Sequence, residues 1–234
     1  MNNKFLKDLF NMLEEDNVDY LVLRGYQNLP EKYSHDIDFS VINENELTSF
    51  FNVLHYLSEK YNYSITRDVV RFGLLKVFLH FGNEILKIDV FCSFSYGGLE
   101  YINIHDLHNS KRKSPTNISI PSLKYELAIS LLKEILHNSR IRKDKIDLLR
   151  TQYNKTTFNQ PFIKYFSKKN IDNISTSLFY NDKLIFRKVA FSCRFNLFFM
   201  NIKLKGLFCV LYNMMNFAFI KYYNKSKYDK IIIN

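Results

Sequence analysis

Glycine is scarce in this chain, and its scarcity removes two common classes of nucleotide site. Only six of the 234 residues are glycine. Neither GxxxxGKS/T nor GxGxxG occurs, so a Walker phosphate loop and a dinucleotide-binding turn are both excluded. The sequence also has no GxSxG, the pattern that presents a nucleophilic serine in many hydrolases.

Cysteine and long apolar runs are sparse as well. Cys92, Cys193 and Cys209 show neither CxxC nor Cys/His ligand spacing, which excludes a disulfide framework and a zinc site. The first eight residues alternate charged and apolar side chains and lack the continuous apolar core of a signal peptide. We therefore expect a cytoplasmic protein in a reducing compartment.

The composition suits one good core, or one domain with a smaller appendage, because 47% of residues are hydrophobic and 24% are charged. The charge is unevenly divided along the chain. Residues 1–100 carry 9 basic and 15 acidic residues, whereas residues 101–234 carry 24 and 8. The basic half could attract nucleotides, polyanions or an anionic membrane, or much of its lysine could simply be solvated surface.

Hydrophobic spacing predicts alternating helices and strands in the first hundred residues. Apolar residues at helical spacing predict a helix over 3–15, followed by a short buried strand over 20–23. A loop containing Pro30 leads to a strand over 36–42, and Asn43 is placed to cap the next helix with Glu46 three residues on. Further strands are expected over 63–69, 74–81 and 84–92.

The last two of these strands are joined by Gly82-Asn83, a hairpin turn with glycine first. With Phe81 opposite Glu84, the register places Lys76 directly across from Asp89 on the same face. Lys76 is therefore a candidate partner for phosphate or carboxylate, although an ordinary cross-strand ion pair explains it equally well.

Three aspartates carry the chemical signal of the sequence. Strand alternation projects Asp36 and Asp38 to one face, and Asp89 lies on a later strand. Neighbouring carboxylates repel each other unless a cation lies between them, and Mg²⁺ prefers hard oxygen ligands. A pair of such ions can support an in-line phosphoryl displacement. Gly25, preceded by Arg24, forms a turn in front of the pair, where a triphosphate could lie.

After Asp89 the sequence becomes less regular, and helical spacing returns beyond Pro121. We expect a helix beginning near Ser122 and running to about residue 136, then a second over about 140–152. His105 and His108, in the irregular part, are interpreted as polar loop residues because no set of acidic partners is apparent. The expected division is a catalytic domain over 1–120, a helical lid over 121–182, and a basic, Phe-rich helical tail over 183–234.

Residues 3–150 resemble the DNA polymerase β-like nucleotidyltransferase superfamily. In that superfamily a helix and strand lead to a glycine motif, an Asp-x-Asp strand and a third Asp, and Gly25, Asp36, Asp38 and Asp89 match those positions. The run Val22-Leu23-Arg24-Gly25-Tyr26 through Leu29-Pro30 to Asp36-Ile37-Asp38 is similar to uncharacterised bacterial nucleotidyltransferases of polysaccharide biosynthesis loci. Tyr26 departs from the superfamily, which has Ser or Gly there.

The helical part is similar to AbiEii-like toxin nucleotidyltransferases, whose Lys…Arg…Lys-Asp-x-x-Asp pattern matches Lys133, Arg140, Lys143, Asp144 and Asp147. The resemblance implies an α+β fold, with a mixed or antiparallel sheet, flanking helices and a helical C-terminal region. It implies two Mg²⁺ ions, or Mn²⁺, on Asp36, Asp38 and Asp89. Nucleotide contacts would come from Arg24, Gly25, Tyr26 and Lys76, with Lys133, Arg140 and Lys143 reaching from the lid.

The function expected from this resemblance is transfer from a nucleoside triphosphate to a small molecule or a cell-surface glycan precursor. Two alternatives stay open. The first is a catalytically degenerate scaffold that associates with a membrane or partner protein, and the second is a toxin acting on tRNA, although nucleic acid is the less favoured partner. A glycosyltransferase using Asp-x-Asp would carry that motif later in the chain than position 36.

The apolar segment 206–220 is flanked by lysines. Fifteen helical residues span about 22 Å, which is short of a hydrocarbon core of about 30 Å. A membrane span is therefore not expected. The segment either packs on the protein or lies on an anionic leaflet, which would make the protein peripheral at the inner face of the membrane.

Overall fold

The computed structural model describes residues 3–32, 36–71, 73–153, 164–180, 183–222 and 231–233. The chain divides into two compact units. The first comprises Met1–Ser93, Ile104–Pro121 and Phe217–Asn234, and the second comprises Phe94–Asn103 and Ser122–Asn216. The expected three-part domain division stays a prediction, because a compact unit is not by itself shown to fold alone.

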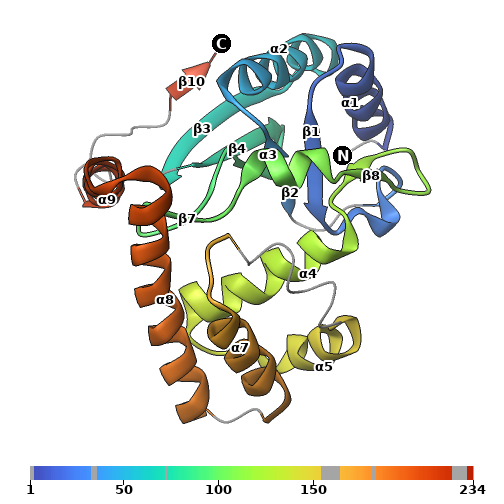
Figure 1. Ribbon diagram of the computed structural model, residues 1–234. Coiled ribbons are helices and arrows are strands. Elements are labelled where there is room, and N and C mark those ends of the chain that lie inside the picture. The colour runs from blue at the N-terminus through green and yellow to red at the C-terminus, as the bar shows by residue number, and fades with distance from the viewer. Residues whose placement is uncertain are drawn as a thin grey trace. The chain divides into compact units, whose positions relative to one another are not determined.

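The first unit is built on a mixed sheet (Figure 1). Its strands lie in the order β1-β2-β5-β4-β3, with the short β10 at the β3 edge. Strands β2 and β5 are parallel, and the other neighbours are antiparallel. This confirms the expected α+β class. The bounds are β1 Tyr20–Arg24, β2 Asp36–Val41, β3 Ser64–Arg71, β4 Leu74–Phe81, β5 Glu84–Phe91 and β10 Ile231–Ile233.

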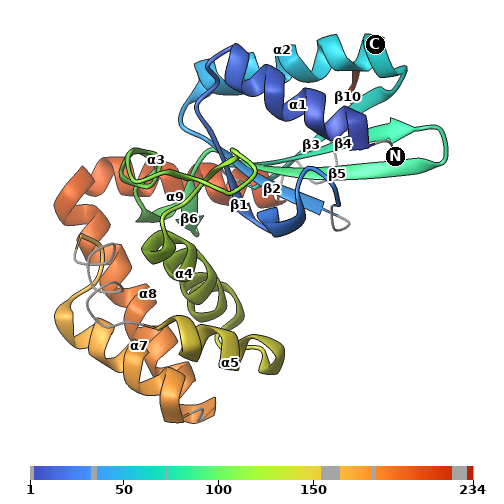
Figure 2. The ribbon, with the colours of Figure 1, turned by 90° about the vertical axis from the view of Figure 1, so that its right-hand side faces the viewer.

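Helices α1 (Asn3–Glu15) and α2 (Glu44–Tyr61) cover the same face of this sheet (Figure 2). Alternate residues of β2 and β5 point at them, so Phe39 and Ile88 are fully buried in one hydrophobic core with the apolar side of α1. Each such side chain stabilises the fold by roughly 1.5–3 kcal/mol. The other residues of these strands, including all three aspartates, therefore project to the opposite face.

The local signals in this unit formed as expected. The Asn43 side chain accepts a hydrogen bond from the Glu46 backbone N–H at 2.9 Å and caps α2. Gly82 has φ of 59°, as the first position of the β4–β5 turn requires. The hairpin pairs Phe81 with Glu84 and Lys76 with Asp89, which confirms the predicted register.

Four short elements also belong to the first unit. The 3-10 turn η1 (Tyr26–Asn28) follows β1, and α3 is Ile104–Asn109. Strands β8 (Arg112–Lys113) and β9 (Ser119–Ile120) pair antiparallel as a second small sheet.

The second unit is mainly helical. Its small hairpin, β6 (Phe94–Tyr96) with β7 (Leu99–Ile102), is accompanied by the helices expected after Pro121. Ser122 occupies the position before the first of them, but its side chain makes no capping hydrogen bond. The described helices are α4 (Leu123–Leu132), the π-helical η2 (Lys133–Asn138), α5 (Lys143–Gln152), α7 (Lys168–Tyr180), α8 (Lys183–Lys205) and α9 (Leu207–Tyr222), of which residues 217–222 belong to the first unit.

Two helix boundaries differ from the prediction. The first helix widens into the π-helical η2 at Lys133, and α5 begins at Lys143, not Arg140. The side chain of Glu134, within η2, bonds the Arg142 backbone N–H at 3.3 Å and so holds the connection between the helices. Among the described helices, none combines the length and the apolar character needed to cross a bilayer.

Candidate metal centre

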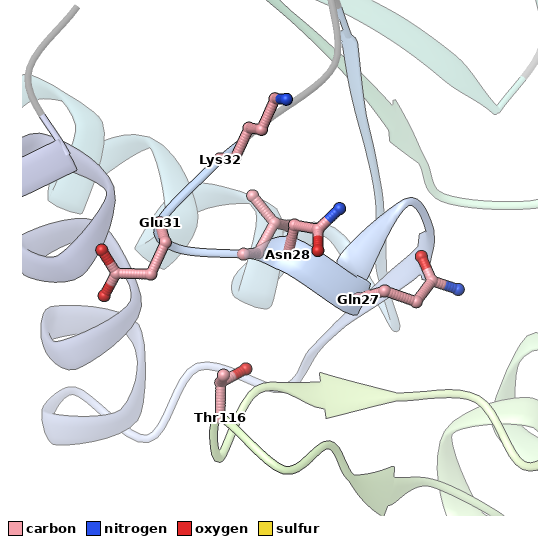
Figure 3. Close-up of a pocket in the computed structure, with 6 residues that line it drawn as sticks. Gln27, Asn28, Glu31, Lys32 and Thr116 are labelled. Atoms are coloured by element: carbon pink, nitrogen blue, oxygen red, sulfur yellow. The ribbon is translucent and has the colours of Figure 1, made fainter.

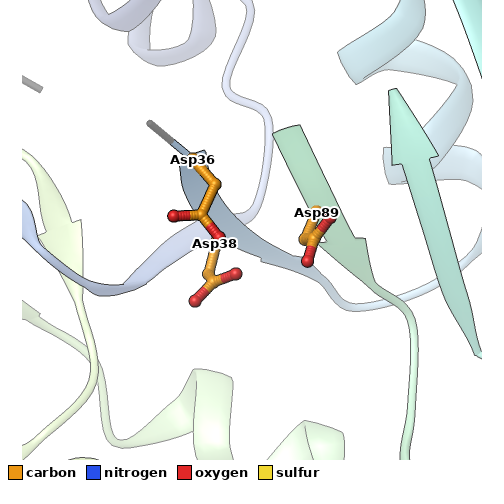
Figure 4. Close-up of side chains that lie close together, drawn as sticks. All are labelled: Asp36, Asp38 and Asp89. Atoms are coloured by element: carbon orange, nitrogen blue, oxygen red, sulfur yellow. The ribbon is translucent and has the colours of Figure 1, made fainter. Parts of the chain in front are cut away.

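Three carboxylates meet on the face of the sheet opposite α1 and α2. Parallel pairing places Asp38 directly beside Asp89, and Asp36 lies one pleat before Asp38 (Figure 4). One carboxylate oxygen from each residue lies within 4.8 Å of the others. The sequence could not pair β2 with β5, because the two strands are separated by α2, β3 and β4. The parallel contact is what converts an Asp-x-Asp pair into a cluster of three.

Two oxygens of this cluster are buried without a hydrogen-bond partner. The Asp38 and Asp89 residues are only 4% and 8% exposed, and Oδ1 of each accepts no hydrogen bond. A buried polar atom left without a partner costs free energy, and a buried carboxylate costs more. Such atoms call for an explanation, and the grouping of three carboxylates favours a bound cation. The donor set, three carboxylates with no nitrogen or sulfur, suits a hard divalent cation such as Mg²⁺ or Mn²⁺.

Two protein cations already contact these carboxylates. The Arg24 guanidinium, at the end of β1, forms an ion pair with Asp38. Lys87 Nζ lies 3.2 Å from Asp89 Oδ1 and 3.5 Å from Asp36 Oδ2, so it bridges two of the three residues. The Lys87 contact to Oδ1 is an ion pair without hydrogen-bond geometry, which is consistent with that oxygen's lack of a hydrogen-bond donor. Three carboxylates and two cations leave one formal negative charge.

Lys87 is the residue that sequence reasoning missed. The predicted partner of Asp89 was Lys76, and Lys76 does lie opposite Asp89 on β4. However, no ion pair between described residues joins Lys76 to Asp89, whose cationic partner is Lys87. The signal was present in the alternation of β5, since a residue two positions before Asp89 must share its face.

The turn after β1 places Tyr26 away from the role its position suggested. Gly25 adopts the left-handed conformation with φ of 71°, which lets the chain reverse into η1. The Tyr26 ring is buried in the hydrophobic core, and its hydroxyl accepts a hydrogen bond from Arg112 Nη2 at 3.2 Å. Its side chain is therefore used in packing, so at position 26 a ligand would contact the backbone.

The three basic residues expected to reach from a lid lie in the second unit. Lys133 begins η2, Arg140 follows it, and Lys143 begins α5. Arg140 and Lys143 are exposed. Whether they approach a nucleotide held at the carboxylates stays a prediction.

The buried side chain of Glu134, which the sequence analysis did not single out, forms ion pairs with two basic residues of this segment. Glu134 Oε1 lies 3.3 Å from Arg142 Nε and 3.6 Å from Lys145 Nζ. Its other oxygen, Oε2, accepts a hydrogen bond from Asn138. Glu134 is fully buried, so its two cations are held by an ion-pair network inside the unit. Arg142 and Lys145 therefore have structural partners, whereas the predicted ligand Lys143 is not part of this network.

His108 is not the polar loop residue that the sequence suggested. It lies in α3, is buried, and bridges Ser40 and Asp19. Its Nε2 lies 3.1 Å from the Ser40 hydroxyl, and its Nδ1 lies 2.8 Å from Asp19 Oδ1. Burial lowers the pKa of His108 despite the opposing hydrogen bond to Asp19. The acidic partner precedes His108 by 89 positions, so sequence spacing gave no sign of it.

The charges determine where the protons lie in the hydrogen-bonded set of Asp19, His108 and Ser40. Burial alone would raise the pKa of Asp19, but hydrogen bonds from His108 and Lys111 outweigh burial and lower it. Asp19 is thus a carboxylate, so Nδ1–H donates to it, and the neutral Nε2 accepts from the Ser40 hydroxyl. Ser40 is fully buried. These three residues cannot act as a hydrolytic triad, because no substrate can reach the serine. Their hydrogen bonds attach α3 to β2 beside the carboxylates.

A hollow of about 390 Å³ lies beside η1 (Figure 3). It is lined by Gln27, Asn28, Leu29, Glu31, Lys32 and Thr116. None of the predicted site residues lines it. Its amide and hydroxyl groups could bind a polar molecule, but it contains no orphaned buried atom comparable with those of the carboxylate cluster.

Comparison with known proteins returned no match to a protein-family profile, a curated protein or a solved structure.

Proposed function

We propose that this protein is a metal-dependent nucleotidyltransferase. It would transfer a nucleotidyl or substituted phosphoryl group from a nucleoside triphosphate, or a similar donor, to a hydroxyl of a small molecule or a cell-surface glycan precursor. The observation that supports this proposal is the pair of buried oxygens on Asp38 and Asp89 that accept no hydrogen bond, beside Asp36. Hard cations and polyphosphates are commonly bound together by such groups.

In this proposal Asp36 and Asp38 hold two Mg²⁺ ions, with Mn²⁺ as an alternative, and Asp89 serves as a third ligand or as the base. The bound metal would neutralise charge on the phosphates and orient them for in-line attack. The carboxylates are well placed to keep such ions fixed, because the parallel β2–β5 pairing holds their backbones in register.

The proposed step is a displacement at phosphorus. The acceptor hydroxyl oxygen forms a bond to the α-phosphorus while the bond from that phosphorus to the bridging oxygen breaks. Pyrophosphate leaves with the electron pair of the broken bond, and the hydroxyl proton passes to Asp89 when that residue acts as base. No oxidant, reductant or further reactant is needed.

Phosphate contacts are assigned to the cations and amides around the cluster. Arg24 carries a positive charge, as arginine does in proteins generally. Burial acts to lower its pKa, but the hydrogen bond and the charge of Asp38 outweigh burial and raise it. Together with the backbone of the Gly25-Tyr26 turn, Arg24 would bind phosphate oxygens. Lys76 would contribute from β4, and Lys133, Arg140 and Lys143 would do so if the second unit approaches the nucleotide.

The test uses Asp38→Asn and the full chain. We expect the wild-type protein to gain thermal stability from Mg²⁺ with one or more nucleoside triphosphates, because a ligand that binds the native state raises the melting temperature. Asp38→Asn should lose this shift and also any release of pyrophosphate. Isothermal titration with Mn²⁺ alone gives a second readout that does not depend on knowing the acceptor.

The matched control is Asp68→Asn. Asp68 lies on β3 opposite Lys76, so it shares the face of the sheet but lies two strands from Asp89. It should leave metal and nucleotide binding unchanged. Full binding and turnover in Asp38→Asn, or an equal loss in Asp68→Asn, would show that the assigned site is wrong.

A second candidate function is a non-catalytic scaffold on the same fold. It is favoured by Arg24 and Lys87, which between them contact all three carboxylates. If these cations substitute permanently for metal, the protein would show no melting shift with any Mg-nucleotide. A nucleotide-selective shift would exclude this candidate.

A further inference from the structure

Helix α8 has apolar residues on two opposite sides, which is unusual for a helix at the surface of a protein. One side is buried: Val189, Ala190, Cys193 and Leu197 pack within the second unit, where α8 contacts α7, η2 and β7. This side accounts for the docking of the helix. A helix that is hydrophobic all round is normally buried all round, so its other side requires an explanation.

The other side of α8 presents a stripe of phenylalanines to solvent. Phe191, Phe195 and Phe199 are 71%, 60% and 50% exposed. They follow one another at intervals of four residues and therefore line up along one side of the helix. The Phe195 and Phe199 ring centroids lie 4.7 Å apart, so the stripe is continuous at that point. Leu184 extends it by nearly two turns toward the start of the helix.

Helix α9, which follows α8 after Gly206, carries further exposed apolar residues within the same unit. Phe208 is 87% exposed, and Leu207, Leu211, Tyr212 and Met215 are also exposed, whereas Val210 is buried. Single exposed apolar residues are normal on a soluble protein, but here many exposed Phe, Leu and Met residues occur on two successive helices. Among the described residues, exposed large hydrophobics are concentrated in these two helices.

The positive charge of residues 183–222 favours an anionic partner. Residues 183–222 include seven Lys or Arg residues and no Asp or Glu. Two of the seven have internal partners: Arg194 bonds the Leu136 carbonyl, and Lys205 pairs with Glu100. Exposed Arg187 lies one turn before Phe191, and exposed Lys203 lies one turn after Phe199, so both ends of the stripe are basic.

We propose that α8 and the first part of α9 form a surface that docks on an anionic lipid bilayer. Phe, Leu and Met side chains would enter the boundary between headgroups and acyl chains, and the basic residues would contact anionic headgroups. The helices would lie in the plane of the interface, because no described helix can cross a bilayer.

Nucleic acid fits this surface less well. Its phosphates would satisfy the lysines and arginines, but it would leave an aliphatic and phenylalanine stripe without apolar partners. A protein partner would need a groove that is both apolar and acidic. Of these three chemistries, an anionic bilayer alone supplies an apolar layer beneath a sheet of negative charge. This inference does not depend on the proposed transferase activity.

The test is co-sedimentation of the full chain with vesicles. Phosphatidylcholine vesicles are compared with vesicles that also contain phosphatidylserine. Wild type should bind the anionic vesicles, bind the neutral ones at least about tenfold more weakly, and be released by high salt. The double substitutions Phe191→Ser/Phe195→Ser and Arg187→Glu/Lys188→Glu should each reduce binding by about tenfold or more. All four side chains are exposed, so melting temperatures should stay close to wild type.

The controls make comparable changes on other helices of the same unit. Lys168→Glu/Lys169→Glu reverses two exposed charges at the start of α7, and Leu148→Ser removes an exposed apolar side chain from α5. Both should bind like wild type. The proposal is overturned by equal binding to neutral vesicles, by no binding to either, or by equal losses in the controls. It is also overturned if Phe191→Ser/Phe195→Ser abolishes a solution dimer while leaving vesicle binding intact.

Discussion

Lys87 holds two carboxylates together where a divalent ion would otherwise be needed. Its ammonium lies 3.5 Å from Asp36 Oδ2 and 3.2 Å from Asp89 Oδ1. Because it is also within reach of any ion held there, it competes with metal for the same oxygens. Arg24 does the same at Asp38, but from the end of β1, where its longer side chain can turn toward a phosphate.

We predict that Lys87→Met increases affinity for Mn²⁺. Removing a unit positive charge less than 4 Å from two carboxylates should strengthen cation binding by about tenfold or more. The metal-free protein should lose stability at the same time, because carboxylate repulsion is no longer offset. Titration calorimetry measures the first effect, and thermal melting in a chelator measures the second.

Lys76→Met is the matched control for this prediction. Lys76 lies on the same face, opposite Asp89, but forms no ion pair with it. Its removal should change Mn²⁺ affinity much less. If Lys87→Met binds Mn²⁺ no better than wild type, Lys87 does not compete with metal, and its role is limited to linking the two strands.

The direction of the Tyr26 ring could not be inferred from the sequence. A tyrosine ring directed at a triphosphate would crowd it, whereas a ring directed into the core would not. The ring lies in the core, and Arg112 binds its hydroxyl. The departure from Ser or Gly therefore changes the packing under the turn, and the φ of 71° at Gly25 keeps the turn itself.

At the scale of elements, α3 is attached to the sheet by the Asp19, His108 and Ser40 chain. Two of its members lie at the same end of neighbouring strands: Asp19 directly before β1, and Ser40 within β2, two residues after Asp38. The anchor therefore joins α3 to β1 and to β2, the strand that carries Asp36 and Asp38. Burial lowers the pKa of His108 and so favours the neutral imidazole, whose Nε2 accepts a hydrogen bond from the Ser40 hydroxyl.

We predict that stability falls when pH drops below about 6.5, the usual pKa of histidine. The folded-state pKa of His108 lies below that value, so the unfolded chain binds a proton first and unfolding becomes more favourable. Asp19 and Lys111 face the imidazole directly and His105 lies near it. The lowered pKa of Asp19 also contributes to stability, but this contribution is lost only at more acidic pH, below about 4.

Urea unfolding between pH 5 and pH 8 measures this effect, with His108→Gln as the comparison. The variant removes the titrating group but keeps a polar side chain, so its stability should be lower overall and flatter across the range. Identical slopes in the two proteins would contradict the assignment of the pH dependence to His108.

At the scale of the whole molecule, α8 has two duties. Its buried side holds the second unit together, and its exposed side carries the proposed membrane surface. Arg194 illustrates the first duty, because its guanidinium bonds the Leu136 carbonyl and the Ser139 hydroxyl. The strong imbalance between an acidic first half and a basic remainder arises in part from this one acid-free segment.

We predict that a chain ending at Asp182 does not fold cooperatively in its second unit. Loss of α8 would expose the surfaces of α7, η2 and β7 that now cover Val189, Ala190, Cys193 and Leu197. Such a loss is comparable with the total stability of a domain, about 5–15 kcal/mol. Circular dichroism melts and limited proteolysis measure it.

A chain ending at Lys205 is the control, because it keeps α8 and removes α9. It should retain a cooperative transition at reduced temperature, since Val210 of α9 is buried. Cooperative unfolding of the Asp182 variant like that of the full chain would contradict the structural role of α8. Substitutions of exposed residues therefore test vesicle binding better than truncation of the chain does.

The sequence by itself determined the local elements. Apolar spacing in α1, the cap at Asn43 and the turn at Gly82 act over a few residues, and each formed as expected. Alternation and one turn were also enough to pair Lys76 with Asp89. The same alternation put Asp36 and Asp38 on one face.

Only the tertiary structure decided which of these faces meet. The parallel pairing of β2 with β5 brought Asp89 beside Asp38 and placed Lys87 opposite Asp36. Long-range packing buried the Tyr26 ring and joined His108 to Asp19 across 89 positions. These contacts depend on how whole elements pack, and local periodicity carries no information about partners so distant in the chain.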